Sequence, residues 1–391
     1  MKRNFFYITL ADFIVRSAYQ MGKTPLLPIF AALLGASDAF LGLIVSVSTV
    51  TGLLLKPLFG ILSDRWGRRV WLLIGTSFFT GVPFLYRFVS TPEHLLAIRL
   101  LHGVSTAIYG PVTLAYIAKR SKNRIAEDVG WFEIARSGGY IVGPALAGWL
   151  LLTIEPATVF TMIGLMSALA FVPVLLLEEY SLEPPTQRQP LGHYVRQALK
   201  TGGQVPAVWL SGGLKAISFV ALYTNKAFLP AHGLAIGLDT LQIGLFFSIQ
   251  EAAHVLLKGI GGRLGDKLGH LWTISLGMAL LSLALCLLPL FTHLVSLFVL
   301  AAIMGGTEAL IFPSAVALAS NQVNKAHLGA AMGLTGMMDN LGKILGPILG
   351  GILLAWLDFA TTYTIMGGLL FLGMLFVVGV GMSERKSGGN A

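Results

Sequence analysis

Twelve apolar runs follow one another along the chain almost without pause, and each is long enough to cross a membrane. They lie at 5–31, 39–62, 70–90, 94–118, 129–152, 158–178, 206–231, 240–264, 271–291, 294–320, 327–355 and 360–382. A helix rises about 1.5 Å per residue, so about 20 residues span roughly 30 Å of hydrocarbon. Continuous runs without period-two alternation exclude a membrane β-barrel. The predicted fold class is an all-α membrane protein with twelve transmembrane helices.

The composition excludes several other classes of protein. Only 12 % of the 391 residues are charged and 55 % are apolar, whereas a soluble domain has about 25 % charged residues. This argues against a soluble enzyme, a disordered chain and a nucleic-acid-binding module. The single cysteine, Cys286, excludes a disulfide framework and a cysteine-based metal site. Because the sequence shows no metal site, nucleophile triad or nucleotide-binding domain, we expect neither catalysis nor a cofactor nor ATP as the energy source.

The topology follows from the positive charges between the runs. The first run follows Met1, Lys2 and Arg3 as a signal peptide would, but it is too long and carries Asp12 and Arg16, so we interpret it as a retained helix. If the N-terminus is inside, the inner loops and tails hold seventeen Lys or Arg residues and the outer loops hold only Arg87. This asymmetry predicts that both termini are cytoplasmic. The absence of glycosylated loops and the short length favour the inner (plasma) membrane of a bacterium.

The chain is an internal duplication. Gly60-Ile-Leu-Ser-Asp64-Arg65-Trp-Gly67-Arg68 recurs as Gly262-Arg-Leu-Gly-Asp266-Lys267-Leu-Gly269-His270, and Gly143-Pro144 recurs as Gly346-Pro347. We predict an N-terminal six-helix half at 1–178, a polar cytoplasmic linker at 179–205, a C-terminal half at 206–382 and a tail at 383–391. Parallel repeats of six helices with a site at their interface characterise a large class of transporters.

Three motifs resemble those of the major facilitator superfamily. The loop residues Gly60, Leu62, Asp64, Arg65, Gly67, Arg68 and Arg69 are similar to its signature, and Arg99-Leu-Leu-His102-Gly103 is similar to an element of its fourth helix. The glycine-proline motifs Gly139-x-x-x-Gly143-Pro144 and Gly342-x-x-x-Gly346-Pro347 resemble the motif of its drug:proton antiporter branch. Ala147 and His102 depart from the family pattern. The resemblance implies an exporter driven by a proton gradient, monomeric by default.

The glycine-proline motifs have a physical reading of their own. Glycines four residues apart let helices approach closely, and Pro144 and Pro347 permit a bend. They fit simple helix packing, and they equally fit a pliant, sealed interface between the halves.

A second predicted element is a cytoplasmic gate. The resemblance implies that Asp64 faces the positive N-terminal end of a helix near 327–330 and holds the cytoplasmic side shut. We place Arg65, Arg68, Asp128, Asp266 and Lys267 in the same gate. The alternative is a solvated cluster of loop charges, which contributes little to stability.

Charges inside the runs are informative because each costs at least ~2.5 kcal/mol at mid-membrane unless it is paired or hydrated. The basic ones are Arg16, Lys23, Lys56, Arg99, Arg136, Lys215, Lys226, Lys258 and Lys343, and the acidic ones are Asp12, Glu133, Glu251, Glu308 and Asp339. His254 adds a titratable group near Glu251.

Six of these charges form the predicted substrate and proton pathway: Asp12, Arg16, Arg99, Lys215, Glu251 and Glu308. Helix rise puts four of them in one layer of the membrane: Asp12, Arg16, Lys215 and Glu308. There Asp12 or Glu308 would take up a proton when its basic partner binds substrate instead. The alternative is a pair of structural salt bridges, Asp12–Arg16 and Lys215–Glu308. Aromatic residues such as Tyr19, Tyr140 and Phe219 are candidates to line a cavity, although packing or lipid-facing roles fit most of them.

A further set of charges is predicted to bridge the halves. Lys56 and Asp339 share a depth if the second and eleventh helices face each other, and Lys258 should lie near Glu133 or Arg136. These pairs would form and break during alternating access. The alternative is that both lysines extend to the cytoplasmic surface.

Three functions remain open. The first is proton-coupled efflux of small amphipathic molecules. The second is a proton-coupled or facilitative carrier of an anionic or zwitterionic metabolite, which the excess of intramembrane bases favours. The third is a lipid flippase or a non-transporting sensor on the same fold. The expected partners are a small-molecule substrate, protons and the lipid bilayer.

Overall fold

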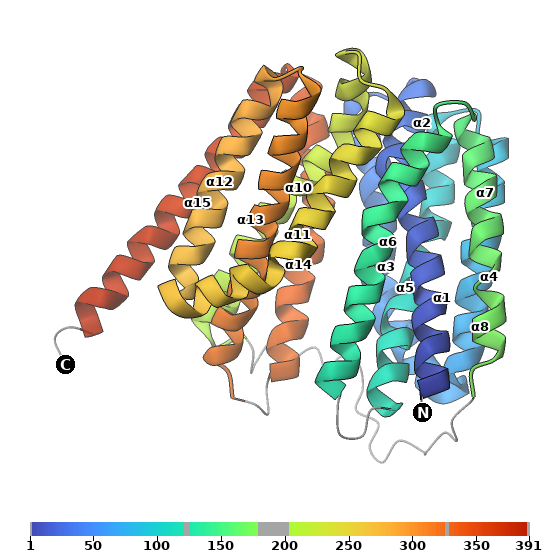
Figure 1. Ribbon diagram of the computed structural model, residues 1–391, viewed down its shortest axis with the longest axis horizontal. Helices are drawn as coiled ribbons and strands as arrows, with labels where there is room; N and C mark the ends of the chain where they lie inside the picture. Colours follow the sequence, from blue (N-terminus) through green and yellow to red (C-terminus); the bar gives the residue numbers. More distant parts are fainter. Residues whose placement is uncertain (1, 121–124, 179–202, 325–327, 389–391) are drawn as a thin grey trace. The chain divides into compact units, whose positions relative to one another are not determined.

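The structure, a computed structural model, describes residues 2–120, 125–178, 203–324 and 328–388, and these contain helices but no strand. Figure 1 shows the helices. Their bounds in the first part of the chain are α1 Lys2–Met21, η1 Gly22–Leu26, α2 Leu27–Leu33, α3 Asp38–Trp66, α4 Arg68–Leu85, η2 Tyr86–Phe88, α5 Pro92–Arg120, α6 Ile125–Leu150, α7 Pro156–Ala168 and α8 Phe171–Leu175. The bounds in the second part are α10 Pro206–Ala235, α11 Thr240–Leu268, α12 His270–Leu287, η3 Leu288–Leu290, α13 Leu294–Asn321, α14 Leu328–Leu354 and α15 Phe359–Gly388.

Each of the twelve predicted runs corresponds to one of these helices or to a broken pair, so the all-α prediction is confirmed. The first run is broken at η1, where Thr24 leaves the helical region with φ −146° and ψ 123°. Pro25 follows it, and the residue before a proline is disfavoured in helical geometry. The helix therefore divides into α1 and α2 at this point.

Nine helices in the described part are long and apolar enough to span a membrane by length and composition. Those that fall short are α1, α4 and α6. Asp12 and Arg16 lie in α1, and Glu133 and Arg136 lie in α6. The charges that weaken the apolar signal of α1 and α6 are also the ones that form the site described below.

The duplicated sequence has duplicated backbone geometry at its turns. Gly67, between α3 and α4, has φ 93° and ψ 139°, and Gly269, between α11 and α12, has φ 94° and ψ 140°. Gly35 and Gly237 form another such pair, with φ 78° and 89°. Positive φ is strained for residues with a Cβ, which explains why both copies keep glycine at these turns.

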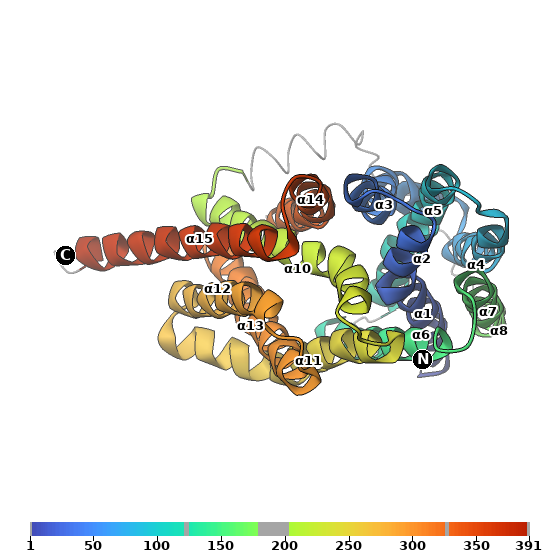
Figure 2. The same ribbon diagram turned by 90° about the horizontal axis from the view of Figure 1, so that it is seen from above.

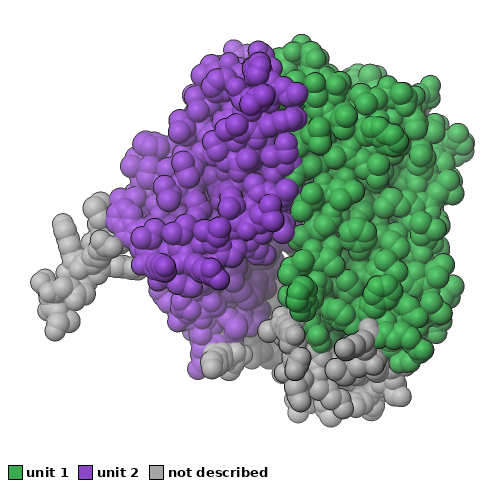
Figure 3. Space-filling view, in the orientation of Figure 1, with its two compact units in different colours: residues 1–187, 226–248 green, residues 188–225, 249–391 purple. Residues whose placement is uncertain are grey.

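Two compact units make up the chain. Unit 1 contains residues 1–187 and 226–248, and unit 2 contains residues 188–225 and 249–391; Figure 3 colours them separately. The end of α10 and the start of α11 thus pack with unit 1 although we predict them in the C-terminal half. The predicted linker lies almost entirely outside the described residues, so that boundary stays a prediction.

Packing within each unit positions the charged side chains. In unit 1, α1 packs along α6, α3 along α5, and α4 along both α5 and α7; in unit 2, α12 packs along α13 and α15. Figure 2 shows these helices from above. The core of unit 1 is built on buried residues of α1, α4, α5 and α6, among them Trp71, Phe79, Tyr109, Tyr116 and Phe132.

The glycine-proline motifs lie at close helix contacts. A Cβ added at Gly139 would lie 2.9 Å from the backbone nitrogen of Ser17, and one added at Gly143 would lie 3.1 Å from that of Met21. The second copy repeats this arrangement, because Gly342 lies against Ala216 and Gly346 against Val220. In both copies the glycines therefore let α6 approach α1, and α14 approach α10, as in other small-residue membrane interfaces.

Candidate functional site

An ion-pair cluster joins α1 to α6 inside unit 1. The Asp12 side chain is completely buried, and it accepts hydrogen bonds from Arg136 Nε at 2.9 Å and Nη2 at 3.2 Å. Arg16 Nε lies 3.6 Å from Asp12 Oδ1, as the four-residue spacing predicts. Arg136 Nη1 also donates to Glu133 Oε1 at 2.7 Å. Arg16 and Arg136 thus share the buried carboxylate of Asp12. Arg136 also pairs with Glu133, whose side chain is 43 % exposed.

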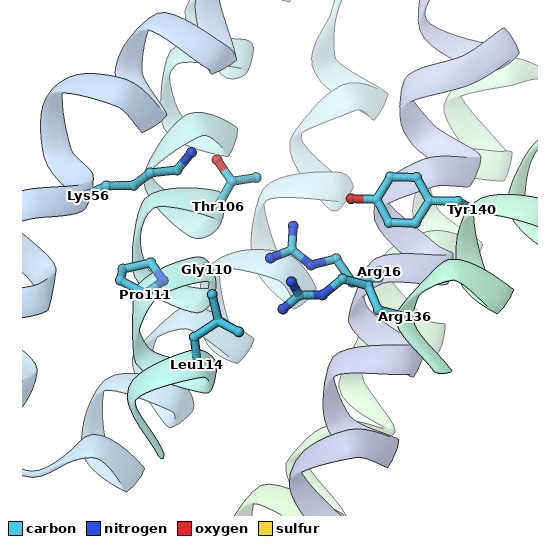
Figure 4. Close-up of a pocket in the computed structure, with 8 residues that line it drawn as sticks. All are labelled: Arg16, Lys56, Thr106, Gly110, Pro111, Leu114, Arg136 and Tyr140. Carbon is cyan, nitrogen blue, oxygen red and sulfur yellow. The ribbon is translucent and has the colours of Figure 1, made fainter. Parts of the chain in front are cut away.

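A cavity of about 410 Å³ opens beside this cluster in unit 1. Its lining comes from four helices: Arg16 of α1, Lys56 of α3, Thr106, Gly110, Pro111 and Leu114 of α5, and Arg136 and Tyr140 of α6. Figure 4 shows the two guanidinium groups side by side, with the Lys56 ammonium and the Tyr140 hydroxyl directed toward the same space. Among the described residues of this lining there are three cations and no carboxylate.

A second polar cluster of unit 1 surrounds Arg99. This side chain is 1 % exposed and donates to the Ser48 hydroxyl. Tyr19 lies within electrostatic range of both Arg99 and Lys23, and the Lys23 ammonium is 5.8 Å from the centre of the Tyr19 ring. Arg99 and Lys23 therefore share Tyr19 as a neighbour.

In unit 2, Lys215 Nζ lies 2.7 Å from Asp339 Oδ2. The alternative that Lys215 pairs with Glu308 is therefore wrong in this structure. The reason is the close contact between α10 and α14, where Gly342 lies against Ala216 and brings Asp339, one turn away, to Lys215. Asp339 thus has a partner in its own unit, and Lys56 lines the cavity of unit 1, so a bridge between the halves stays a prediction.

Glu308 belongs to a different cluster in unit 2. Gln250 Nε2 donates to Glu308 Oε1 at 2.7 Å, and both side chains are buried. His254 Nδ1 lies 3.8 Å from Glu251 Oε1 and 3.9 Å from Glu308 Oε2, and its ring makes a T-shaped contact with that of Phe312. The cluster brings together two predicted residues, Glu251 and Glu308, and it can hold a proton on a carboxylate or on the imidazole. Glu251, His254 and Glu308 also fit a metal ion, because their ligand atoms lie within 4.8 Å of one another.

Lys343 is held among aromatic rings in unit 2. Its ammonium lies 4.2 Å from the centre of the Phe219 ring and 5.9 Å from that of Tyr223. A cation over aromatic faces is stabilised by their quadrupoles, the more so away from water.

The other predicted residues have varied surroundings. Lys258, Asp266 and Lys267 are exposed. Glu133 pairs with Arg136 in its own unit, and the predicted proximity of Lys258 to Glu133 or Arg136 stays a prediction. Arg68 donates to the Ala115 carbonyl on α5. Asp128 is partly buried. The side chains of Asp64 and Arg65 lie outside the described residues, as does residue 327 at the helix end that Asp64 is predicted to face. The gate and its Asp64 contact therefore stay predictions.

A contact between α6 and the start of α11, within unit 1, involves only small and uncharged residues. The Thr240 hydroxyl donates to the Gly148 carbonyl at 2.7 Å, and Ala145 N donates to the Ser248 hydroxyl at 3.0 Å. Gly244 lies against the carbonyl of Pro144. We call these six residues the α6–α11 seam. The positive-inside topology predicts that the seam faces the outer side.

The profile of the major facilitator superfamily matches residues 10–225 and again residues 212–390. The chain belongs to the major facilitator superfamily. It is therefore a transporter of small molecules, integral to a membrane, rather than an enzyme. The two matches correspond to the duplication seen in the sequence.

Members of the superfamily with similar sequences include several described as drug efflux pumps. The chain is 25 % identical to a multi-drug resistance efflux pump PmrA homologue of Lactococcus lactis, over 95 % of this chain and 92 % of the relative. It is 24 % identical to multidrug resistance protein 2 of Bacillus subtilis, over 93 % and 91 %. It is also 24 % identical to a transporter of the superfamily from Methanocaldococcus jannaschii whose function is uncharacterised. That match covers 93 % of this chain and 94 % of the relative.

Solved structures of superfamily members share the fold. A mutant of the nucleoside transporter NupG matches with a TM-score of 0.83 at 17 % identity, over 96 % of this chain and 99 % of NupG. A transporter of the POT family in complex with a thioalcohol-conjugated peptide matches with a TM-score of 0.82 at 14 % identity, over 97 % and 96 %. At these identities the likeness establishes the fold.

Sequence reasoning missed two parts of the site. Gln250 was not singled out, although a glutamine beside Glu251 in an apolar helix is a signal that could have found it. Lys56 was assigned to a bridge between halves, and its place in the cavity lining depends on the packing of α3 along α5.

Proposed function

We propose that the protein is a proton-coupled exporter of small amphipathic molecules that works by alternating access. The observation that carries this proposal is the cluster of Glu251, His254, Glu308 and Gln250. A carboxylate inside a membrane protein is costly unless it is paired, hydrated or protonated, and such residues mark proton paths. The groups near Glu308 include an amide, a second carboxylate and a histidine, and the carboxylate and the histidine can exchange a proton with it.

The surroundings of the cluster fit a proton carrier. The Gln250 amide stabilises the charged form of Glu308, and His254 lies between the two carboxylates. Lys258, one turn from His254 on α11, is the nearby base of that helix and is exposed. We infer that Glu308 holds the transported proton and that His254 passes it to or from Glu251.

The relatives support the direction of transport. Proteins described as multidrug efflux pumps match nearly the whole chain at 24–25 % identity. The α6–α11 seam supports alternating access, since small residues without long side chains let two helices separate and rejoin at little entropic cost. Export of an amphipathic molecule also agrees with the cavity of unit 1, in which cations face an apolar wall.

Proton flux in everted vesicles tests the proposal. Acid-loaded vesicles that contain the protein are challenged with a panel of cationic drugs and anionic metabolites, and a pH-sensitive dye follows the lumen. Substrate should release protons through the wild type, and Glu308→Gln should lower that flux about tenfold or more, the effect typical of losing a proton-transfer group. Glu155→Gln is the matched control, because Glu155 is exposed at the start of α7.

Two results would contradict proton coupling. One is substrate transport with unchanged proton flux in both Glu308→Gln and Glu251→Gln. The other is an equal loss in Glu155→Gln, which would indicate a general effect of removing an acid.

We also propose that the protein lies in the inner membrane with both termini in the cytoplasm. The seventeen-to-one distribution of Lys and Arg supports this orientation. A reporter that is active only in the cytoplasm should be active when fused after Ala391 and inactive when inserted after Ser90, in the loop between η2 and α5. The reverse pattern would contradict the proposed orientation.

A further inference from the structure

The cavity of unit 1 has an excess of positive charge. Arg16, Lys56 and Arg136 line it, and none of its eight lining residues is acidic. Two carboxylates behind the lining, Asp12 and Glu133, balance the two arginines. Within the described residues of unit 1, Lys56 forms no ion pair with a carboxylate, so one positive charge faces the cavity without a fixed partner in its own unit.

The cations are arranged to converge. The two guanidinium groups point to the space that the Lys56 ammonium and the Tyr140 hydroxyl also face (Figure 4). Arg16 Nε is buried without a hydrogen-bond partner, and Arg16 Nη2 extends across to Gly110 of α5, 3.9 Å from the place of its absent Cβ. Arg16 and Lys56 are close enough to repel each other. Such repulsion is strong away from water, and an anion between the groups would relieve it.

The opposite wall of the cavity is apolar. Gly110, Pro111 and Leu114 of α5 contribute no charge, and the volume of about 410 Å³ falls within the range of small-molecule sites. A ligand that matches both walls has an acidic group at one end and an apolar body at the other.

We propose that this cavity binds the acidic group of an amphipathic anion, with Arg16, Arg136 and Lys56 as its charge partners and Tyr140 as a hydrogen-bond partner. Arginine suits the task because its planar fork of donors matches carboxylate, sulfonate and phosphate oxygens. The inference names the substrate class of the proposed transporter and rests on that function. Among small amphipathic molecules, the exported ones are anions.

Binding of three probes that share one apolar body tests this. 1-Naphthyl phosphate, neutral 1-naphthol and a cationic naphthylmethyl-trimethylammonium are titrated into the full-length protein in phosphatidylcholine nanodiscs by calorimetry. The phosphate should bind at least about tenfold more tightly than the other two, because hydrogen bonds to a charged group contribute that much. Its affinity should fall as salt is raised. Equal affinities for the three probes would overturn the proposal.

Variants of Lys56 identify the site. Lys56→Gln should weaken 1-naphthyl phosphate binding about tenfold, and Lys56→Arg should keep most of it. Arg87→Gln is the matched control, since Arg87 is exposed and lies outside this cavity. Arg16→Gln gives a second variant at the site, and an unchanged circular dichroism spectrum shows that each variant is folded. Unchanged phosphate binding in both Lys56→Gln and Arg16→Gln would overturn the proposal.

A separate titration identifies the source of the anion. The phosphate titration is repeated in nanodiscs that contain phosphatidylglycerol. Competition by this lipid would assign the acidic group to a lipid headgroup, and its absence would assign it to a soluble amphiphile; both results support the anion site.

Phosphate binding and proton flux test the anion site and proton coupling separately. Selective phosphate binding together with absent proton flux would overturn proton coupling and leave the anion site in place. Proton flux driven by the cationic probe, without selective phosphate binding, would overturn the anion site and leave the exporter in place.

Discussion

The two units contain the same ion pair with its charges exchanged. In unit 1 the acid, Asp12, is on α1, the first membrane helix of the repeat, and the base, Arg136, is on α6, the fifth. In unit 2 the base, Lys215, is on α10, the first membrane helix of the second repeat, and the acid, Asp339, is on α14, the fifth. Both pairs are separated by 124 residues, and the positions correspond across the repeat at an offset of 203.

The exchange extends one turn further along each helix. The residue four positions after each acid is a base, Arg16 or Lys343, and the residue four positions after each paired base is aromatic, Tyr140 or Phe219. In unit 2 the second base lies over the aromatic ring, whereas in unit 1 the base and the aromatic residue line the cavity. The repeat therefore preserves the packing of the helices and the presence of a pair, but not which helix carries the acid.

The largest expected effect comes from breaking the pair of unit 1. Arg136→Gln leaves the completely buried Asp12 with only the more distant Arg16. We expect the free energy of unfolding to fall by about 3–5 kcal/mol, the usual cost of an uncompensated buried charge. Detergent-induced unfolding in micelles, followed by circular dichroism, measures it. The double variant Asp12→Asn/Arg136→Gln should recover most of the loss; a double variant as unstable as the single one would contradict the explanation.

Close helix packing should respond alike in both units. Gly139→Ala and Gly342→Ala each place a Cβ against the backbone of the facing helix, and we expect each to lower the free energy of unfolding by about 1–3 kcal/mol. Gly130→Ala and Gly333→Ala are matched controls on the same two helices, since nothing lies within 4 Å of their added Cβ atoms. These controls should be neutral or slightly stabilising. A loss in only one unit would break the equivalence of the two repeats.

Removing the base of unit 2 should cost less than removing that of unit 1. The Asp339 side chain is 17 % exposed, so water partly replaces the lost partner in Lys215→Gln. We expect a loss of about 1.5–2 kcal/mol in the same unfolding experiment, near the contribution of a charged hydrogen bond. A loss equal to that of Arg136→Gln would show that exposure does not explain the difference between the pairs.

The smallest effect concerns a hydroxyl that only unit 2 has at this packing position. Thr224 donates to the Gly346 carbonyl at 2.8 Å, and Met21 stands at the corresponding position of unit 1. Thr224→Val should lower the free energy of unfolding by about 0.6 kcal/mol, the average for hydrogen bonds between membrane helices. A loss several times larger would mean that this hydrogen bond, rather than the glycine, holds α14 against α10.

The sequence predicted local features of the site better than its cross-helix partners. The spacing of Asp12 and Arg16 fixes their separation, because helical geometry alone brings residues four apart together. The partner of Lys215 depends on the rotation of α10 and α14 about their axes. Helix rise puts Glu308 and Lys215 at similar depth, but depth leaves open which faces meet, and the choice of Glu308 was wrong for that reason. The twelve helices were predictable because a long apolar run indicates a membrane helix whatever its tertiary contacts are.

The α6–α11 seam has an electrical consequence. None of its six residues is ionisable, so its parting would move no side-chain charge through the field across the membrane. A voltage of 100 mV acts on a moved elementary charge with about 2.3 kcal/mol but does no work on a neutral contact. Opening of the seam is therefore a voltage-insensitive step. Any dependence of transport on membrane potential has to arise elsewhere, where the buried arginines, lysines and carboxylates change their distance from the two surfaces.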